Sequence, residues 1–197
     1  YDFGENNAGV CRLKIRGERG QKIILQFGEL LAIDGGMDLR TMAFMPSEFN
    51  QRDVYILKGD PEGEEWTPRF TYHGFRYAEV TGYPVPLLRD DITACSLYTD
   101  VFNDGFFTCG EPILNTIYRC SVQCEKSNIH SVLTDCPQRD ERMGWLNDAT
   151  VRFEATPYIA DVGRLFPKIV RDCMDVQDAD GSITCTAPFA FGCRPAD

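Results

Sequence analysis

Long apolar runs and an excess of basic charge are both missing from this sequence. No window approaches the ~18 to 20 consecutive apolar residues that a membrane-spanning helix needs. The 30 acidic residues outnumber the 20 basic ones, which leaves a formal net charge of -10 at pH 7. Such a charge repels phosphate backbones and anionic lipids. We therefore expect a globular protein with no nucleic-acid partner and no membrane partner.

Cysteine pairs of the kind that bind metals are missing too. The nine cysteines are odd in number and form no CxxC pair, which favours reduced thiols and a cytoplasmic location. Cys120 and Cys124 could share one helical face, but His130 is the one histidine near them, so we expect no metal site and no cofactor. The chain has no start methionine before Tyr1 and no closing signal, and we interpret it as an internal piece of a longer protein.

Residues 1–86 have the alternation and the turn residues that are typical of β-strands. Two alternating runs, residues 10–16 and 21–27, flank a glycine-containing turn, and this predicts a hairpin. Further strands are predicted at residues 54–57, 69–72 and 74–80, with a bulge at the glycine between the last two. Several short strands with few helical signals predict an antiparallel β-sandwich.

The pattern becomes helical after a linking segment, residues 87–110, which contains one extended run at 92–99. In residues 111–197 the first helix is predicted to start at Pro112, because apolar residues then follow at helical spacing. Two more helices are predicted at residues 146–156 and 158–176, the last one kinked at Pro167. The expected order is a β domain followed by a helical domain, without the βαβ alternation of a parallel sheet.

The most unusual stretch is TDCPQRDERMGWLND, residues 134–148, which holds four carboxylates and two arginines. Glycoside hydrolysis needs one protonated carboxylic acid and one ionised carboxylate. Neighbouring arginines lower a carboxyl pKa, which is the wrong direction for an acid, so an acid here needs an apolar wall such as Met143 and Trp145. From the residues alone, a solvated loop whose ion pairs hold a helix entrance explains the stretch equally well.

The same stretch closely resembles the signature of bacterial α-L-rhamnosidases of glycoside hydrolase family 78. The resemblance covers nearly the whole chain, and it includes residues 1–6, 27–29, 68–77 and 114–118. It implies a hydrolase that removes terminal α-L-rhamnose with inversion, built as a β-sandwich followed by an (α/α)6 barrel. The implied partner is a rhamnose-containing glycoside.

Carried over residue by residue, the resemblance implies that Glu141 is the general acid and that Asp135 and Asp148 bind the rhamnose hydroxyls. Asp140 is the alternative acid, because some relatives shorten the motif just before the glutamate. The remaining motif residues expected to shape the sugar subsite are Arg139, Arg142 and Trp145.

Two departures from the family pattern stand out. The chain has Leu146-Asn147 where the family usually has Thr-Gly, so substrate preference could differ. The family's catalytic base is a glutamate much later in the barrel, and Glu154, the last glutamate here, does not match it. We therefore expect this chain alone to be inactive, and to self-associate through helical faces that the missing helices would cover.

Other residues have simpler explanations. The aromatic stretch at residues 68–77 is explained by cross-strand packing, although a non-catalytic sugar-binding sandwich that uses Tyr72 or Tyr77 is the rival hypothesis. His130 is expected to bond a backbone carbonyl instead of lining a subsite. The acidic cluster at residues 178–182 is interpreted as a turn, because it lacks the further ligands of a calcium loop.

Overall fold

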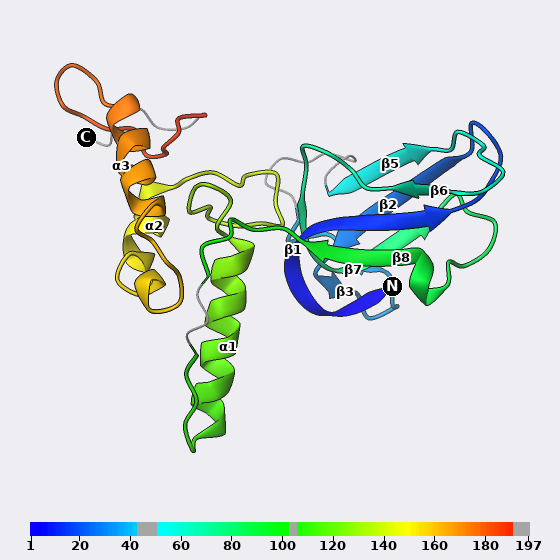
Figure 1. Ribbon diagram of the computed structural model, residues 1–197, viewed down its shortest axis with the longest axis horizontal. Coiled ribbons are helices and arrows are strands. Elements are labelled where there is room, and N and C mark those ends of the chain that lie inside the picture. Colours follow the sequence, from blue (N-terminus) through cyan, green and yellow to red (C-terminus); the bar gives the residue numbers. More distant parts are fainter. Residues whose placement is uncertain (43–50, 103–105, 191–197) are drawn as a thin grey trace. The chain divides into compact units, whose positions relative to one another are not determined.

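The computed structural model describes residues 1–42, 51–102 and 106–190 (Figure 1). The chain forms two compact units. The β unit comprises Tyr1–Leu97 together with Pro137–Asp140, and the helical unit comprises Tyr98–Cys136 and the chain from Glu141 onward. In the described ranges, no helix is long and apolar enough to cross a membrane.

The β unit is built on a six-stranded antiparallel sheet with the path β5-β2-β7-β1-β6, to which β8 adds by pairing with β1. The strands are β1 (Asp2–Ile15), β2 (Lys22–Gly28), β5 (Arg52–Ile56), β6 (Glu64–Trp66), β7 (His73–Thr81) and β8 (Ile92–Ser96). A separate two-stranded sheet consists of β3 (Leu30–Leu31) and β4 (Met37–Asp38), and a 3₁₀ turn at Arg89–Asp91 precedes β8.

The large sheet curls, because its two end strands meet through their side chains. The ring of Tyr55 in β5 stacks on Trp66 in β6, with ring centroids 4.8 Å apart. The Tyr55 hydroxyl also donates a hydrogen bond of 2.5 Å to Glu64. Inside the curl lies an apolar core whose members are almost fully shielded from solvent: Cys11, Leu13, Ile15, Ile23, Leu25, Phe27, Leu57, Phe75, Ala78, Leu87 and Ile92.

Three strand predictions are wrong: the hairpin, the strand at residues 69–72 and the bulge at Gly74. The expected hairpin does not form, because β7 lies between β1 and β2 and pairs with both of them. Residues 69–72 form no strand, and Gly74 lies inside an unbroken β7. A turn between two alternating runs specifies that the chain reverses, but the partner of each strand is chosen by long-range packing.

The helical unit contains three α-helices among the described residues: α1 (Pro112–Ser127), α2 (Leu146–Arg152) and α3 (Leu165–Asp175), with a 3₁₀ turn at Thr156–Tyr158. The predicted start of α1 is confirmed, with Pro112 in its first turn. The third helix begins later than expected, so Pro167 falls in its first turn and causes no kink, because first-turn amides lack a helical acceptor. Residues 178–182 form the expected turn, closed by the Asp178 amide and the Ser182 carbonyl at 2.9 Å.

The small apolar core of this unit takes Ala149 from α2, Leu165 and Ile169 from α3, and Ile129 and Leu133 from the segment after α1. In α1, the residues that are buried are Glu125 and Ser127, whereas Ile113 is 58% exposed and Ile117 is 53% exposed. An antiparallel β domain followed by helices is thus confirmed. The second layer of a sandwich and the (α/α)6 barrel stay predictions.

Candidate functional site

The acidic loop is closed at its base by a pair of hydrogen bonds. The amide of Asp135 donates to the Met143 carbonyl at 3.1 Å, and the Met143 amide donates to Asp135 Oδ1 at 2.8 Å. Between them, Arg142 has a positive φ of 51°, a conformation that few non-glycine residues adopt. The half-buried Asp135 carboxylate is therefore held by the backbone of its own loop.

Trp145 orients Glu141. Its indole Nε1 donates a hydrogen bond of 2.9 Å to Glu141 Oε1, and both side chains are partly buried. The backbone around Trp145 is fixed in turn by the segment at residues 185–187, because Leu146 donates to the Cys185 carbonyl and Ala187 donates to the Gly144 carbonyl, each at 2.9 Å. A tryptophan anchored in this way presents Glu141 in one defined position.

Asp135 and Glu141 come together at this loop. One carboxylate oxygen from each, and the sulfur of the buried Cys136, all lie within 4.8 Å of one another. Carboxylate oxygens grouped in this way can accept hydrogen bonds from the hydroxyls of a sugar or bind a cation. Thiolate and carboxylate are both zinc ligands, and the two carboxylates can equally accept hydrogen bonds from sugar hydroxyls.

The other predicted site residues are distributed over both units. Asp148 is exposed in the first turn of α2, and Arg142 is half-buried in the helical unit. Arg139 and Asp140 are also half-buried, but they belong to the four-residue stretch that groups with the β unit. Within the helical unit, the structure thus brings Asp135, Glu141 and Trp145 together. The roles of all these residues stay predictions.

A buried ion pair behind the loop was not predicted from the sequence. Arg152 binds Glu125 through two hydrogen bonds of 2.8 Å, and it also donates to the carbonyl of Thr134 at 3.0 Å. The hydroxyl of Thr156 donates to Glu125 at 3.2 Å. This network holds the residue that directly precedes Asp135, and its members are too far apart in the sequence for any spacing to reveal them.

The two histidines serve the fold. His130 donates through Nε2 to the Ser127 carbonyl at 3.1 Å, as expected, and burial lowers the pKa of His130 although this bond acts in the opposite direction. His73 is buried in the β unit, where it stacks on Phe27 with ring centroids 4.4 Å apart. Its Nε2 lies 2.8 Å from Asp53 Oδ1. Within the aromatic stretch, His73 and Phe75 pack inside the sheet domain as expected, whereas Phe70 is fully exposed.

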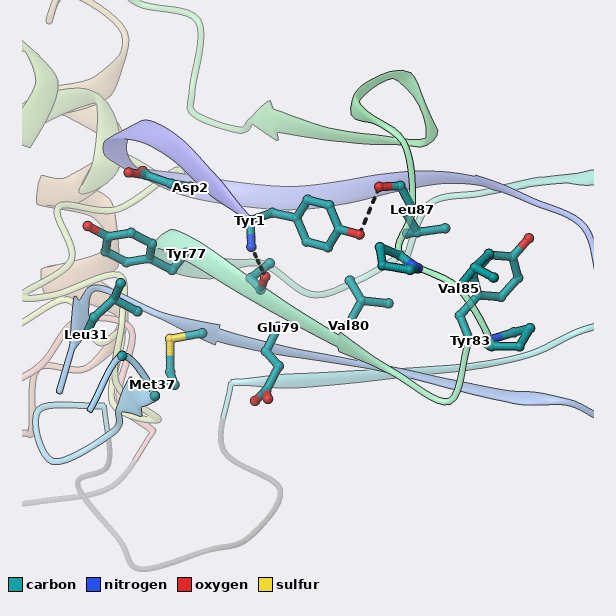
Figure 2. Close-up of a pocket in the computed structure, with 15 residues that line it drawn as sticks. Tyr1, Asp2, Leu31, Met37, Tyr77, Glu79, Val80, Tyr83, Val85 and Leu87 are labelled. Carbon is teal, nitrogen blue, oxygen red and sulfur yellow. Dashed lines mark hydrogen bonds between the residues drawn. The ribbon is translucent and has the colours of Figure 1, made fainter. Parts of the chain in front are cut away.

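The β unit also contains an open cavity of about 700 Å³ that the sequence did not suggest (Figure 2). Its walls include Met37, Tyr77 and Glu79. The hydroxyl of Tyr1 donates a hydrogen bond of 3.1 Å to the Leu87 carbonyl, and both residues line the same cavity. None of the site residues predicted in the acidic loop lines this cavity, but Tyr77 of the rival hypothesis does.

Comparisons with protein families match nearly all of the chain. The model of the bacterial alpha-L-rhamnosidase concanavalin-like domain matches residues 1–98. The model of the bacterial alpha-L-rhamnosidase 6 hairpin glycosidase domain matches residues 103–195. A curated alpha-L-rhamnosidase from Streptomyces avermitilis is 36% identical over 190 residues, which are 95% of this chain and 18% of that protein.

Solved structures give the same result. The alpha-L-rhamnosidase from Dictyoglumus thermophilum matches with a TM-score of 0.88 and 38% identity, over 95% of this chain and 21% of that one. The Streptomyces avermitilis alpha-L-rhamnosidase, crystallised in complex with L-rhamnose, matches with a TM-score of 0.86 and 34% identity, over 96% of this chain and 18% of that one. The chain therefore spans about a fifth of the length of these relatives.

Proposed function

Because the chain belongs to the bacterial α-L-rhamnosidase family, we propose that it forms part of an enzyme that hydrolyses terminal α-L-rhamnose from glycosides, with Glu141 as the general acid. The observation that carries this proposal is the pairing of Glu141 with Asp135 beside the Trp145 indole. A solvated loop with no chemical role would not need two converging carboxylates and an aromatic neighbour.

In this proposal the two carboxylates have different roles. Trp145 Nε1 donates a hydrogen bond of 2.9 Å to Glu141, which orients this side chain as the acid. The Met143 amide donates to Asp135 Oδ1 at 2.8 Å and holds this carboxylate on its own loop beside Glu141. Glu141 then protonates the glycosidic oxygen, and Asp135 accepts hydrogen bonds from the rhamnose hydroxyls.

The other motif residues complete the sugar subsite in this proposal. Asp148 binds further hydroxyls, and the face of Trp145 packs against the apolar side of the deoxysugar, which carries a methyl group. Arg139 and Arg142 donate hydrogen bonds to sugar oxygens. The reaction is inverting, and an ionised carboxylate outside these 197 residues activates the water.

The helical unit is the start of an (α/α)6 barrel in this proposal. The half-exposed Ile113 and Ile117 of α1 are where further helices pack. Alone, the 197-residue chain is expected to hydrolyse an aryl α-L-rhamnoside at the background rate and to self-associate through this face. A cytoplasmic location stays a prediction.

The test uses the full-length protein that carries this sequence, with nitrophenyl α-L-rhamnoside as the substrate. Glu141→Gln is expected to lower kcat by roughly 10²- to 10⁴-fold, because it removes the proton donor and keeps the shape of the side chain. Glu154→Gln makes the same chemical change at an exposed glutamate and should leave kcat unchanged. If Glu141→Gln turned over like the wild type, or if Asp140→Asn were the variant that lost activity, Glu141 would not be the acid.

A non-catalytic sugar-binding module is not favoured, because residues 103–195 match a glycosidase domain. Under that rival hypothesis, Tyr77→Ala would abolish binding of rhamnosides and Glu141→Gln would have no effect.

A further inference from the structure

Gly74 lies at a special point of the sheet. It is buried within β7 and pairs directly with Ala8 of β1, so the two smallest residue types lie opposite each other. Its neighbours His73 and Phe75 are both buried on the Phe27 side, with ring centroids 4.4 and 4.7 Å from that ring. Since side chains alternate along a strand, Gly74 and Ala8 face the opposite side of the sheet.

The Pro137–Gln138 part of the acidic loop packs against Gly74. A Cβ atom added to Gly74 would lie 2.7 Å from the Gln138 amide nitrogen, 2.8 Å from Gln138 Cα and 2.8 Å from the Pro137 carbonyl carbon. These are backbone atoms, so no side-chain rotation relieves the overlap. The φ of Gly74 lies outside the left-handed region, and the missing space is therefore what excludes a side chain there.

The chain around this contact links the sheet to the candidate acid. Pro137–Asp140 form part of the β unit, in the same compact body as Gly74. Asp135 and Cys136 precede this stretch directly, and Glu141 follows it directly. A shift of the Pro137–Gln138 backbone is therefore transmitted through a few covalent bonds to both carboxylates.

Building on the proposed function, we propose that Gly74 is a positioning residue for the glycosidase reaction. Because Gly74 has no side chain, the Pro137–Gln138 backbone packs directly on β7. This packing contact, which we call the seat, sets the positions of Glu141 and Asp135. Gly74 touches no substrate in this proposal and acts only through the loop. A displacement of about 1 Å in reacting groups is enough to cost up to roughly a hundredfold in rate.

The experiment measures kcat, KM and the thermal transition of Gly74→Ala in the full-length protein, with kcat normalised to the folded fraction. We expect kcat to fall roughly tenfold to a hundredfold while KM changes much less, since the proton donor is misplaced more than the sugar is lost. Gly110→Ala is the matched control, because a Cβ there meets nothing within 4 Å. Ile23→Val loosens the sheet core away from the loop and should lower the melting temperature at unchanged kcat per folded molecule.

Pro137→Gly tests the same seat from the other side, without adding atoms to the sheet. It frees the loop backbone, so kcat should again fall with little change in melting temperature. The inference is overturned if folded Gly74→Ala keeps the wild-type kcat, or, where Gly74→Ala does not fold, if Pro137→Gly keeps it. The proposed function fails separately, if the wild type does not hydrolyse the rhamnoside or if Glu141→Gln remains active.

Discussion

The two units of this chain differ in the size of the apolar core that each one encloses. The curled sheet encloses a core in which Leu13, Leu25 and Phe27 are fully buried. In the helical unit, α1 leaves Ile113, Leu114 and Ile117 about half exposed. A sheet that curls on itself can close a core with its own strands, whereas a helix with an apolar face needs neighbouring helices. The β unit thus encloses the larger closed core, and the helical unit leaves the apolar residues of α1 exposed.

The comparison predicts that truncating a large apolar side chain costs much stability in the β unit and little in the helical unit. Phe27→Ala should destabilise the β unit by about 3 to 5 kcal/mol, because it opens a cavity in a closed core. Ile117→Ala should change the stability of the 197-residue chain by less than about 0.5 kcal/mol, since the side chain is already 53% exposed. Denaturant unfolding followed by Trp66 fluorescence in a Trp145→Phe background reports on the β unit. The helical unit is followed by Trp145 fluorescence in a Trp66→Phe background. Similar losses from both truncations would contradict the comparison.

The ion pair between Arg152 and Glu125 should be the main polar support of the helical unit. Arg152→Met leaves the Glu125 carboxylate, 12% exposed, without its two-point partner, and should cost about 3 kcal/mol. Arg171→Met alters an exposed arginine and is the matched control. The measurement is unfolding monitored through Trp145. An equal effect of the two substitutions would show that the ion pair does not support this unit.

The smallest expected effect is a pH dependence of the stability of the β unit. Burial alone would raise the pKa of Glu64, but hydrogen bonds from Tyr55 and from the amides of Lys58, Gly59 and Asp60 outweigh it and hold the pKa at about 2. Since this lies below the ordinary value of 4.5, the stabilisation is present above about pH 4.5 and is lost as the pH falls towards 2.

Unfolding of the β unit should therefore become easier between pH 6 and pH 3, and Glu64→Gln should flatten that dependence. The exposed neighbour Glu65 provides the control, since Glu65→Gln should leave the dependence intact. A wild-type pH profile that Glu64→Gln does not change would assign the acid sensitivity to other groups.

Local sequence patterns predicted the elements better than their partners. Alternation located β2 and β5, and Pro112 marked the start of α1, because these signals lie within a few residues. The insertion of β7 between β1 and β2 could not be predicted, since it depends on contacts among residues far apart in the chain. The late start of α3 was missed because proline fits a first turn as well as it fits a kink.

The candidate site follows the same rule. Asp135, Glu141 and Trp145 could be predicted together because one contiguous motif carries them. Three other features join segments that are far apart in the sequence, so no local pattern reveals them. They are the Glu125–Arg152 ion pair, the seat of Pro137 on Gly74 and the cavity beside Tyr77.

The central claim is that Glu141 delivers the proton to the departing oxygen. The most direct measurement is kcat for wild type and Glu141→Gln over a series of aryl α-L-rhamnosides, from dinitrophenyl to unsubstituted phenyl, with the full-length protein. A departing dinitrophenolate needs little protonation, so its turnover should survive in Glu141→Gln, whereas the phenyl substrate should lose roughly 10³-fold or more. An equal loss across the whole series would contradict the assignment of Glu141 as the acid.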